Sequence, residues 1–173
     1  TQLVLIPEHM VLMYACFKIG AIIAPLDLRL QDREVVREIR KIEPKAFFFL
    51  GNTPVRDFRT VGRSVKNECP YVKHLIQFTP DPQPGEILDG AIAITELMCK
   101  GGLLLIKIKD IFTGRLKKAY GQVQTKTPAL IIFTTGTTGD PKPAMLSHEN
   151  IIVQNQILSR GMGMWDDDRG VVL

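Results

Sequence analysis

The sequence predicts an α/β fold with mostly parallel sheet layers and flanking helices. Short apolar runs bounded by turn residues, at 46–50 and 128–133, are typical of buried parallel strands. Segments with helical spacing of apolar residues lie between such runs, most clearly at 8–19 and 32–41. Strands that alternate with helices imply right-handed crossovers and a parallel sheet.

The first section, residues 1–78, is predicted to alternate strand and helix. The expected elements are strand 2–6, helix 8–19, strand 21–26, helix 32–41, strand 46–50, helix 53–68 and strand 72–78. Gly20 suits the end of the first helix and Asp32 the N-cap of the second. The first helix should bury an apolar stripe made of Val11, Leu12, Ala15, Cys16 and Ile19.

Two further sections follow, at 79–125 and 126–173. The first opens on a proline-rich break and should continue as surface helices. The second should hold a phosphate-binding loop. The expected elements are helices 92–100 and 108–120, strand 128–133, loop 134–142, a short apolar piece at 143–146 and helix 148–160, capped by Ser147.

The three consecutive phenylalanines, Phe47, Phe48 and Phe49, admit two interpretations. They could line a fatty-acid pocket, or they could fill the core of a parallel sheet. A continuous apolar run bounded by Pro44 and Gly51 favours the core.

The composition excludes several classes of protein. Apolar residues make up 45% of the chain and charged residues 23%, which are globular values, and the net charge of +4 is mild. Basic residues are spread without aromatic interleaving, so no nucleic-acid partner is expected. Cys16, Cys69 and Cys99 form no pair at metal or disulfide spacing, which favours a cytoplasmic setting. Residues 10–26 are apolar, but Lys18 interrupts them, so no transmembrane span is predicted.

The loop at 134–142 carries the strongest functional signal. Glycines let a backbone approach an anion closely, successive N–H groups can line an anion site, and threonine hydroxyls add donors. The loop follows a buried strand, where open α/β sheets bind ligands. Its residues are Thr134, Thr135, Gly136, Thr137, Thr138, Gly139, Asp140, Pro141 and Lys142. A flexible surface turn is the alternative, but placement and composition favour a polyphosphate-binding loop. The spacing differs from the P-loop, in which lysine directly follows glycine.

Residues 133–142 resemble the signature loop of the adenylate-forming superfamily, which contains acyl-CoA synthetases, adenylation domains and luciferases. The similarity continues through 147–150, and an upstream block at 6–26 resembles the strand, helix and strand that precede the loop in that family. The resemblance implies that the chain is part of the N-terminal domain of an adenylate-forming enzyme. Residues 1–173 would belong to that one domain, with the C-terminal domain absent.

The resemblance also implies a reaction and its participants. A carboxylate attacks the α-phosphate of ATP, and a thiol, most commonly CoA, then takes the acyl group; the expected partners are thus a small carboxylic acid and CoA. Residues 134–142 would hold the nucleotide, with Lys142 as the catalytic residue and Thr138 near Mg²⁺. Asp140 is expected to shape the turn before Pro141. Fatty acid metabolism is the favoured setting, because stand-alone members are most commonly acyl-CoA synthetases.

Two positions depart from the family pattern. Thr135 replaces the more usual serine and keeps its hydroxyl, whereas Pro143 replaces the usual glycine and removes a backbone N–H. The family's acidic Mg²⁺ ligand, its ribose-binding aspartate and its adenylation lysine match nothing in 1–173, so the chain alone is expected to be inactive. Three alternatives remain: an ATP-binding phosphotransferase-type domain, a peptide-synthetase adenylation domain, and a non-catalytic family member.

Overall fold

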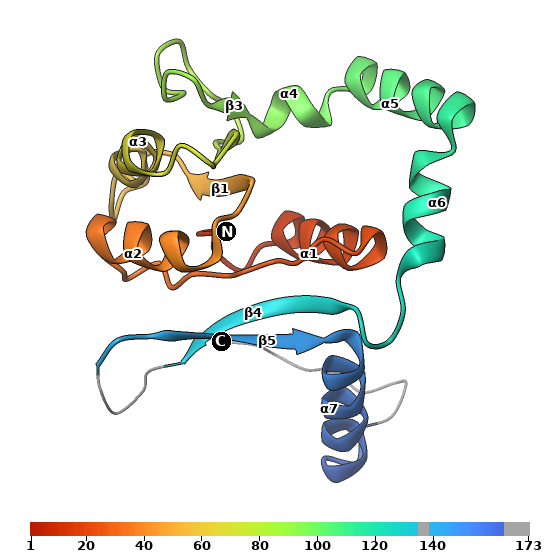
Figure 1. Cartoon of the computed structure of the whole chain (residues 1–173). Helices are drawn as coiled ribbons and strands as arrows, with labels where there is room; N and C mark the ends of the chain where they lie inside the picture. Colours follow the sequence, from red (N-terminus) through yellow and green to blue (C-terminus); the bar gives the residue numbers. More distant parts are fainter. Residues whose placement is uncertain (135–138, 165–173) are drawn as a thin grey trace.

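The computed structural model describes residues 1–134 and 139–164. Figure 1 shows helices around two small sheets. Along the chain the elements are α1 (Pro7–Ile19), α2 (Asp32–Ile42), β1 (Ala46–Leu50), α3 (Arg59–Glu68), β2 (His74–Phe78), β3 (Ile92–Ala93), α4 (Ile94–Met98), α5 (Lys100–Thr113), α6 (Arg115–Gln122), β4 (Pro128–Thr134), β5 (Lys142–Ser147) and α7 (His148–Gly161).

The predicted parallel sheet is confirmed in the first half of the chain. Its strands lie in the order β1-β2-β3, and β1 pairs with β2 over its full length, from Ala46 opposite His74 to Leu50 opposite Phe78. Helices α2 and α3 bury apolar side chains in the same core. That core contains Leu3, Leu26, Val35, Val36, Ile39, Phe47, Phe49, Leu50, Phe58, Val61, Val65, Cys69, Leu75 and Leu88.

The buried side of β1 settles the interpretation of the phenylalanine run. Phe47 and Phe49 are fully buried, and their rings stack with centroids 5.6 Å apart. Phe48 points to the other side of the strand and is half-buried. The core interpretation is therefore confirmed for the two inward-facing rings.

Two predicted strands are shorter in the structure. Residues 2–6 and 21–26 each pair at a single position, Gln2 with Phe49 and Ile23 with Leu130, both in parallel. A strand needs a partner along its length. Pro7 starts a helix straight after the first segment, and Pro25 lacks an N–H in the second, so neither pairing extends.

The predicted core stripe of α1 is wrong in part. Val11 and Ile19 are 67% and 42% exposed, and Ala15 is also exposed, whereas Leu12 and Cys16 are half-buried. Apolar residues occupy nearly every position of this helix, so periodicity does not single out one face. The helix ends as predicted, with Gly20 at a positive φ of 70°.

Two helix starts also differ from the prediction. The cap of α2 is Gln31 rather than Asp32, because Glu34 reaches back and accepts from the Gln31 N–H at 2.7 Å. Helix α3 begins only at Arg59, since residues 53–58 form a turn. In that turn the Thr53 hydroxyl donates to the Arg56 carbonyl at 2.7 Å.

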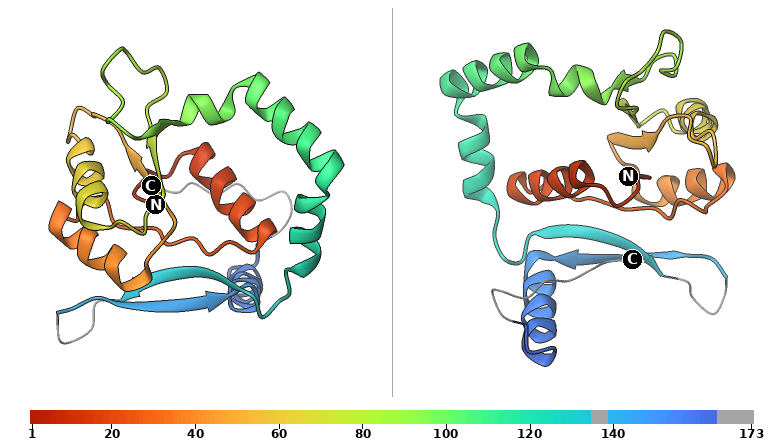
Figure 2. Two further views of the ribbon diagram at one scale, coloured as in Figure 1. Left: turned by 45° about the horizontal axis from the view of Figure 1, so that its top comes forward. Right: turned by 180° about the vertical axis from the view of Figure 1, so that it is seen from behind.

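The middle of the chain forms an arch of helices. Figures 1 and 2 show α4, α5 and α6 leaving β3 and descending past α1 to the start of β4. Surface helices were predicted here, and α5 exposes apolar side chains such as Leu104, Ile111 and Phe112. Within the described residues, no helix combines the length and apolar character that a membrane crossing requires.

The prediction of a buried parallel strand at 128–133 is wrong in part: the run forms β4 of an antiparallel hairpin with β5, and within β4 only Ala129 is fully buried, because the hairpin lies at the surface. The piece at 143–146, which was expected only as an apolar segment, is part of β5. Strand β5 pairs with β4 from Pro128 opposite Ser147 to Thr134 opposite Lys142. Ile23 bridges the outer edge of β4, where its N–H donates to the Ala129 carbonyl at 3.0 Å and its carbonyl accepts from the Ile131 N–H at 2.9 Å. This bridge attaches the hairpin to the segment after α1.

Gly62 of α3 provides a test of the core. A Cβ added there would lie 2.6 Å from the Phe49 ring, which is held by its stacking on Phe47. Gly62→Ala should lower the free energy of unfolding by about 1–3 kcal/mol, despite the better helix propensity of alanine. The matched control is Gly121→Ala in α6, where nothing lies within 4 Å of the new methyl. The control should be neutral or stabilising in urea denaturation, and equal effects of the two changes would contradict this packing.

Glu38 of α2 gives a pH-dependent prediction. The residue is 3% exposed, and burial raises the pKa of its carboxyl, against the opposing effect of Arg37 and Lys41. A carboxyl whose pKa is raised by folding costs stability as the pH rises through that pKa. Glu38→Gln should therefore raise the free energy of unfolding by about 1 kcal/mol near neutral pH. The gain should shrink as the pH falls toward the ordinary pKa of a glutamate carboxyl, and a gain that grows on acidification would refute the assignment.

Candidate functional site

The predicted loop connects the two strands of the hairpin, and the structure describes its two ends. Thr134 is the last residue of β4 and Lys142 the first of β5, and the two are paired in register. The Thr134 hydroxyl also donates to the Lys142 carbonyl at 3.3 Å. Gly139 has a φ of 74°, which favours glycine. The predicted residues Thr135, Gly136, Thr137 and Thr138 lie outside the described residues.

Asp140 makes contacts that sequence reasoning missed. Its carboxylate accepts a hydrogen bond from the Lys41 ammonium at 2.8 Å, and the Arg37 guanidinium lies 3.6 Å away. Lys41 also donates to the Pro141 carbonyl at 2.6 Å. These partners come from α2, about a hundred residues earlier, and no local pattern in the sequence could have indicated them.

The charges at this end of the hairpin are predominantly positive. Arg37, Lys41 and Lys142 surround the single carboxylate of Asp140, and they hold its pKa below the ordinary value, with the Lys41 hydrogen bond as the largest cause. Among the described residues no carboxylate forms an ion pair with Lys142, whose side chain is exposed. An exposed ammonium beside a surplus of positive charge is suited to bind an anion.

The helix after the hairpin starts as predicted. Ser147 caps α7, where its hydroxyl accepts from the Asn150 N–H at 3.3 Å and its own N–H donates to the Asn150 side chain at 2.9 Å. The ring of His148 packs edge-on against Phe17 of α1, with centroids 5.6 Å apart. His148 therefore joins α7 to α1, and the structure gives it a packing role.

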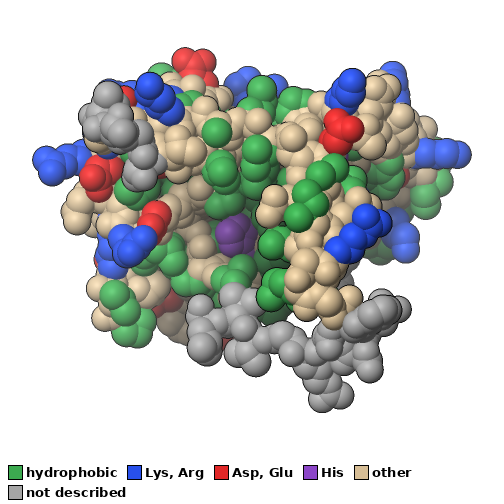
Figure 3. All heavy atoms as spheres, turned by 90° about the horizontal axis from the view of Figure 1, so that it is seen from below, with side chains coloured by type: hydrophobic (Ala, Val, Ile, Leu, Met, Phe, Trp, Pro, Cys, Tyr) green, Lys and Arg blue, Asp and Glu red, His purple; other side chains and the backbone are tan. Residues whose placement is uncertain are grey.

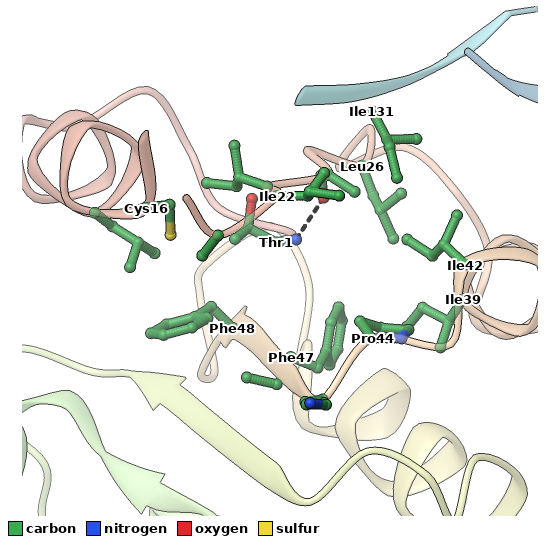
Figure 4. Close-up of a pocket in the computed structure, with 16 residues that line it drawn as sticks. Thr1, Cys16, Ile22, Leu26, Ile39, Ile42, Pro44, Phe47, Phe48 and Ile131 are labelled. Carbon is green, nitrogen blue, oxygen red and sulfur yellow. Dashed lines mark hydrogen bonds between the residues drawn. The ribbon is translucent and has the colours of Figure 1, made fainter. Parts of the chain in front are cut away.

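A separate apolar cavity of about 540 Å³ lies between the hairpin and the parallel sheet. Figure 4 shows it between Cys16 of α1, Phe47 and Phe48 of β1, and Ile131 of β4. Its other lining residues are mostly aliphatic, and it contains none of the predicted loop residues.

The described residues offer little for a metal. They contain no group of three or more histidine, cysteine, aspartate or glutamate side chains that could hold a metal ion. Asp140 is engaged by Lys41, and Thr138, the predicted Mg²⁺ contact, is outside the described residues. The described residues therefore form no ready-made cage for a metal, and no step below depends on Mg²⁺.

Comparison with solved structures supports the fold. A putative long-chain-fatty-acid CoA ligase from Rhodopseudomonas palustris superposes with a TM-score of 0.63 at 17% identity, covering 94% of this chain and 34% of that one. At this identity the likeness concerns the fold alone. It agrees with the predicted α/β fold, and this chain covers about a third of that structure.

Two curated relatives extend the comparison. Long-chain fatty acid transport protein 5 of Mus musculus is 57% identical over 37 residues, which are 21% of this chain and 5% of that protein. The mitochondrial medium-chain acyl-CoA ligase of Danio rerio is 28% identical over 158 residues, which cover 84% of this chain and 24% of that protein. The chain thus spans at most about a quarter of the length of these relatives.

The family model with the description "AMP-binding enzyme" matches residues 3–172, nearly the whole chain. That match includes the loop, the hairpin and the parallel sheet, so it extends well beyond the signature residues. The chain belongs to the AMP-binding enzyme family of adenylate-forming ligases.

Proposed function

We propose that this chain supplies the ATP phosphate-binding loop of a longer ligase that activates a carboxylic acid. The observation that carries the proposal is the placement of Lys142, which is exposed at the end of the loop, two residues from the Asp140 carboxylate that Lys41 engages, and unpaired with any described carboxylate. Family membership supplies the reaction class.

The proposed chemistry has two steps. A carboxylate oxygen attacks the α-phosphorus of ATP, the bond to the β-phosphate oxygen breaks, and pyrophosphate leaves. A thiolate then attacks the acyl carbon and AMP leaves with the electron pair of the broken C–O bond. The first step needs donors and cations at the leaving pyrophosphate, and Lys142 with the N–H and hydroxyl groups of 134–139 would supply them. Mg²⁺ is expected to accompany the nucleotide.

CoA is the proposed thiol acceptor, and a fatty acid the proposed class of substrate. The support is the set of relatives, which includes a medium-chain acyl-CoA ligase and a long-chain-fatty-acid–CoA ligase. A cytoplasmic setting stays a prediction. The chain alone is expected to be inactive, since it spans about a quarter of the ligases that it resembles.

Lys142→Ala tests the proposal in the full-length protein. Acid-dependent exchange of pyrophosphate into ATP, measured with fatty, aromatic and amino acids, should fall by about tenfold to a thousandfold, because a cation at the leaving group is lost. Lys126→Ala, which removes an exposed lysine before β4, is the matched control and should leave the exchange unchanged. Transfer of the γ-phosphate without acid-dependent exchange would instead indicate a phosphotransferase, and dependence on a carrier protein would indicate a peptide-synthetase domain.

Pro143→Gly tests the departure beside the lysine. Pro143 lacks an N–H and lies opposite Phe133 in the hairpin. Restoring the N–H should lower the KM for ATP by about threefold to tenfold, if that group contributes one hydrogen bond to the phosphates. Pro143→Ala separates the N–H from the flexibility of glycine and should give a similar gain. Unchanged KM in both variants would show that the proline carries no penalty.

A further inference from the structure

Lys41 contacts the loop at two points on adjoining residues. Its ammonium donates to the Asp140 carboxylate at 2.8 Å and to the Pro141 carbonyl at 2.6 Å, although 99 and 100 residues separate the partners. The Lys41 side chain is 25% exposed, so it is partly withdrawn from water. Most exposed ion pairs contribute little to stability. Two hydrogen bonds from one ammonium, however, also restrain the backbone direction of the segment 140–141.

These contacts bear directly on Lys142. Pro141 immediately precedes it, so the Lys41 contacts restrain the chain on its amino-terminal side. On the other side, the Lys142 carbonyl accepts from the Thr134 hydroxyl. Lys41 also engages the Asp140 carboxylate, which would otherwise be available to neutralise Lys142 two residues away.

The helix that carries Lys41 is itself firmly placed. Val35, Val36 and Ile39 of α2 are buried in the core, so the helix has little freedom to move relative to the sheet. A hydrogen bond from such a rigid helix therefore restrains the loop residue that it contacts. Arg37, one turn earlier, adds charge at 3.6 Å without a hydrogen bond.

We propose that Lys41 is a positioning residue for Lys142. Through its contacts with Asp140 and Pro141, Lys41 holds the carboxyl end of the loop in the geometry that binds the polyphosphate of ATP. The inference rests on the proposed function. Lys41 touches no substrate in this scheme, and it acts through Asp140 and Pro141.

Kinetics of the full-length protein test the consequence for ATP. Lys41→Ala should raise the KM for ATP by roughly threefold to tenfold and leave the KM for the acid within about twofold. It should also lower kcat, but by less than Lys142→Ala does, because Lys142 is still present and only less firmly held. Loss of folded protein would lower kcat without changing KM, so this pattern separates positioning from stability. Lys41→Arg should recover most of the loss, because arginine can still donate to both oxygens.

Arg40→Ala is the matched control. Arg40 lies next to Lys41 on α2 and forms a 2.8 Å ion pair with Glu68 of α3, so its removal deletes the same charge away from the loop. The control should leave the KM for ATP unchanged. If Arg40→Ala raises that KM as much as Lys41→Ala does, general electrostatics explains the effect and the positioning role is overturned.

Amide hydrogen exchange without nucleotide separates this inference from the proposed function. Lys41→Ala should speed exchange across residues 139–147 by about threefold or more relative to both wild type and Arg40→Ala. Equal exchange in all three proteins would overturn the positioning role even if the enzyme uses ATP. A third outcome is possible, in which amide hydrogen exchange is faster in Lys41→Ala but the wild-type protein shows no acid-dependent pyrophosphate exchange. That outcome would uphold the restraint on the loop and reject the proposed ligase activity.

Discussion

The position of the loop depends on the parallel bridge between Ile23 and Leu130. Two backbone hydrogen bonds, from Ile23 to Ala129 and from Ile131 to Ile23, join the hairpin to the segment that follows α1. An isolated two-stranded hairpin is at best marginally stable in water. This bridge therefore positions the hairpin against the first section of the chain, and the hairpin in turn positions the loop that joins its two strands.

Side-chain contacts at the two ends of the hairpin complete this attachment. His148 packs on Phe17 of α1 where β5 passes into α7, and Lys41 of α2 holds Asp140 near the loop. The bridge and these contacts all reach the body of the first section, which has the buried core. A loop becomes a useful binding site when a rigid scaffold positions it, and these attachments provide the scaffold.

Figure 3 shows the face seen from below, where hydrophobic side chains gather between charged groups at the margin.

The sequence predicted elements whose signals are local. The run at 46–50 is β1 over the same residues, and Ser147 caps α7, because burial and capping depend on neighbouring residues. Pairing partners are not local. The single-residue pairings of Gln2 and Ile23 and the Lys41 contacts depend on segments far apart in the chain, and no spacing in the sequence records them. The loop was predicted from its composition and α2 from its spacing of apolar residues, but the contact between them was not.

The place of Pro143 explains how the chain accommodates its departure from the family pattern. Among the described residues β5 pairs only with β4, so one of its edges carries no neighbouring strand. Proline is tolerated on such edge strands because a missing N–H there breaks no ladder on the open side. Pro143 stays in register opposite Phe133, and Lys142 before it still pairs with Thr134. The hairpin therefore accommodates the proline in register, and a role of the missing N–H would concern contacts beside Lys142.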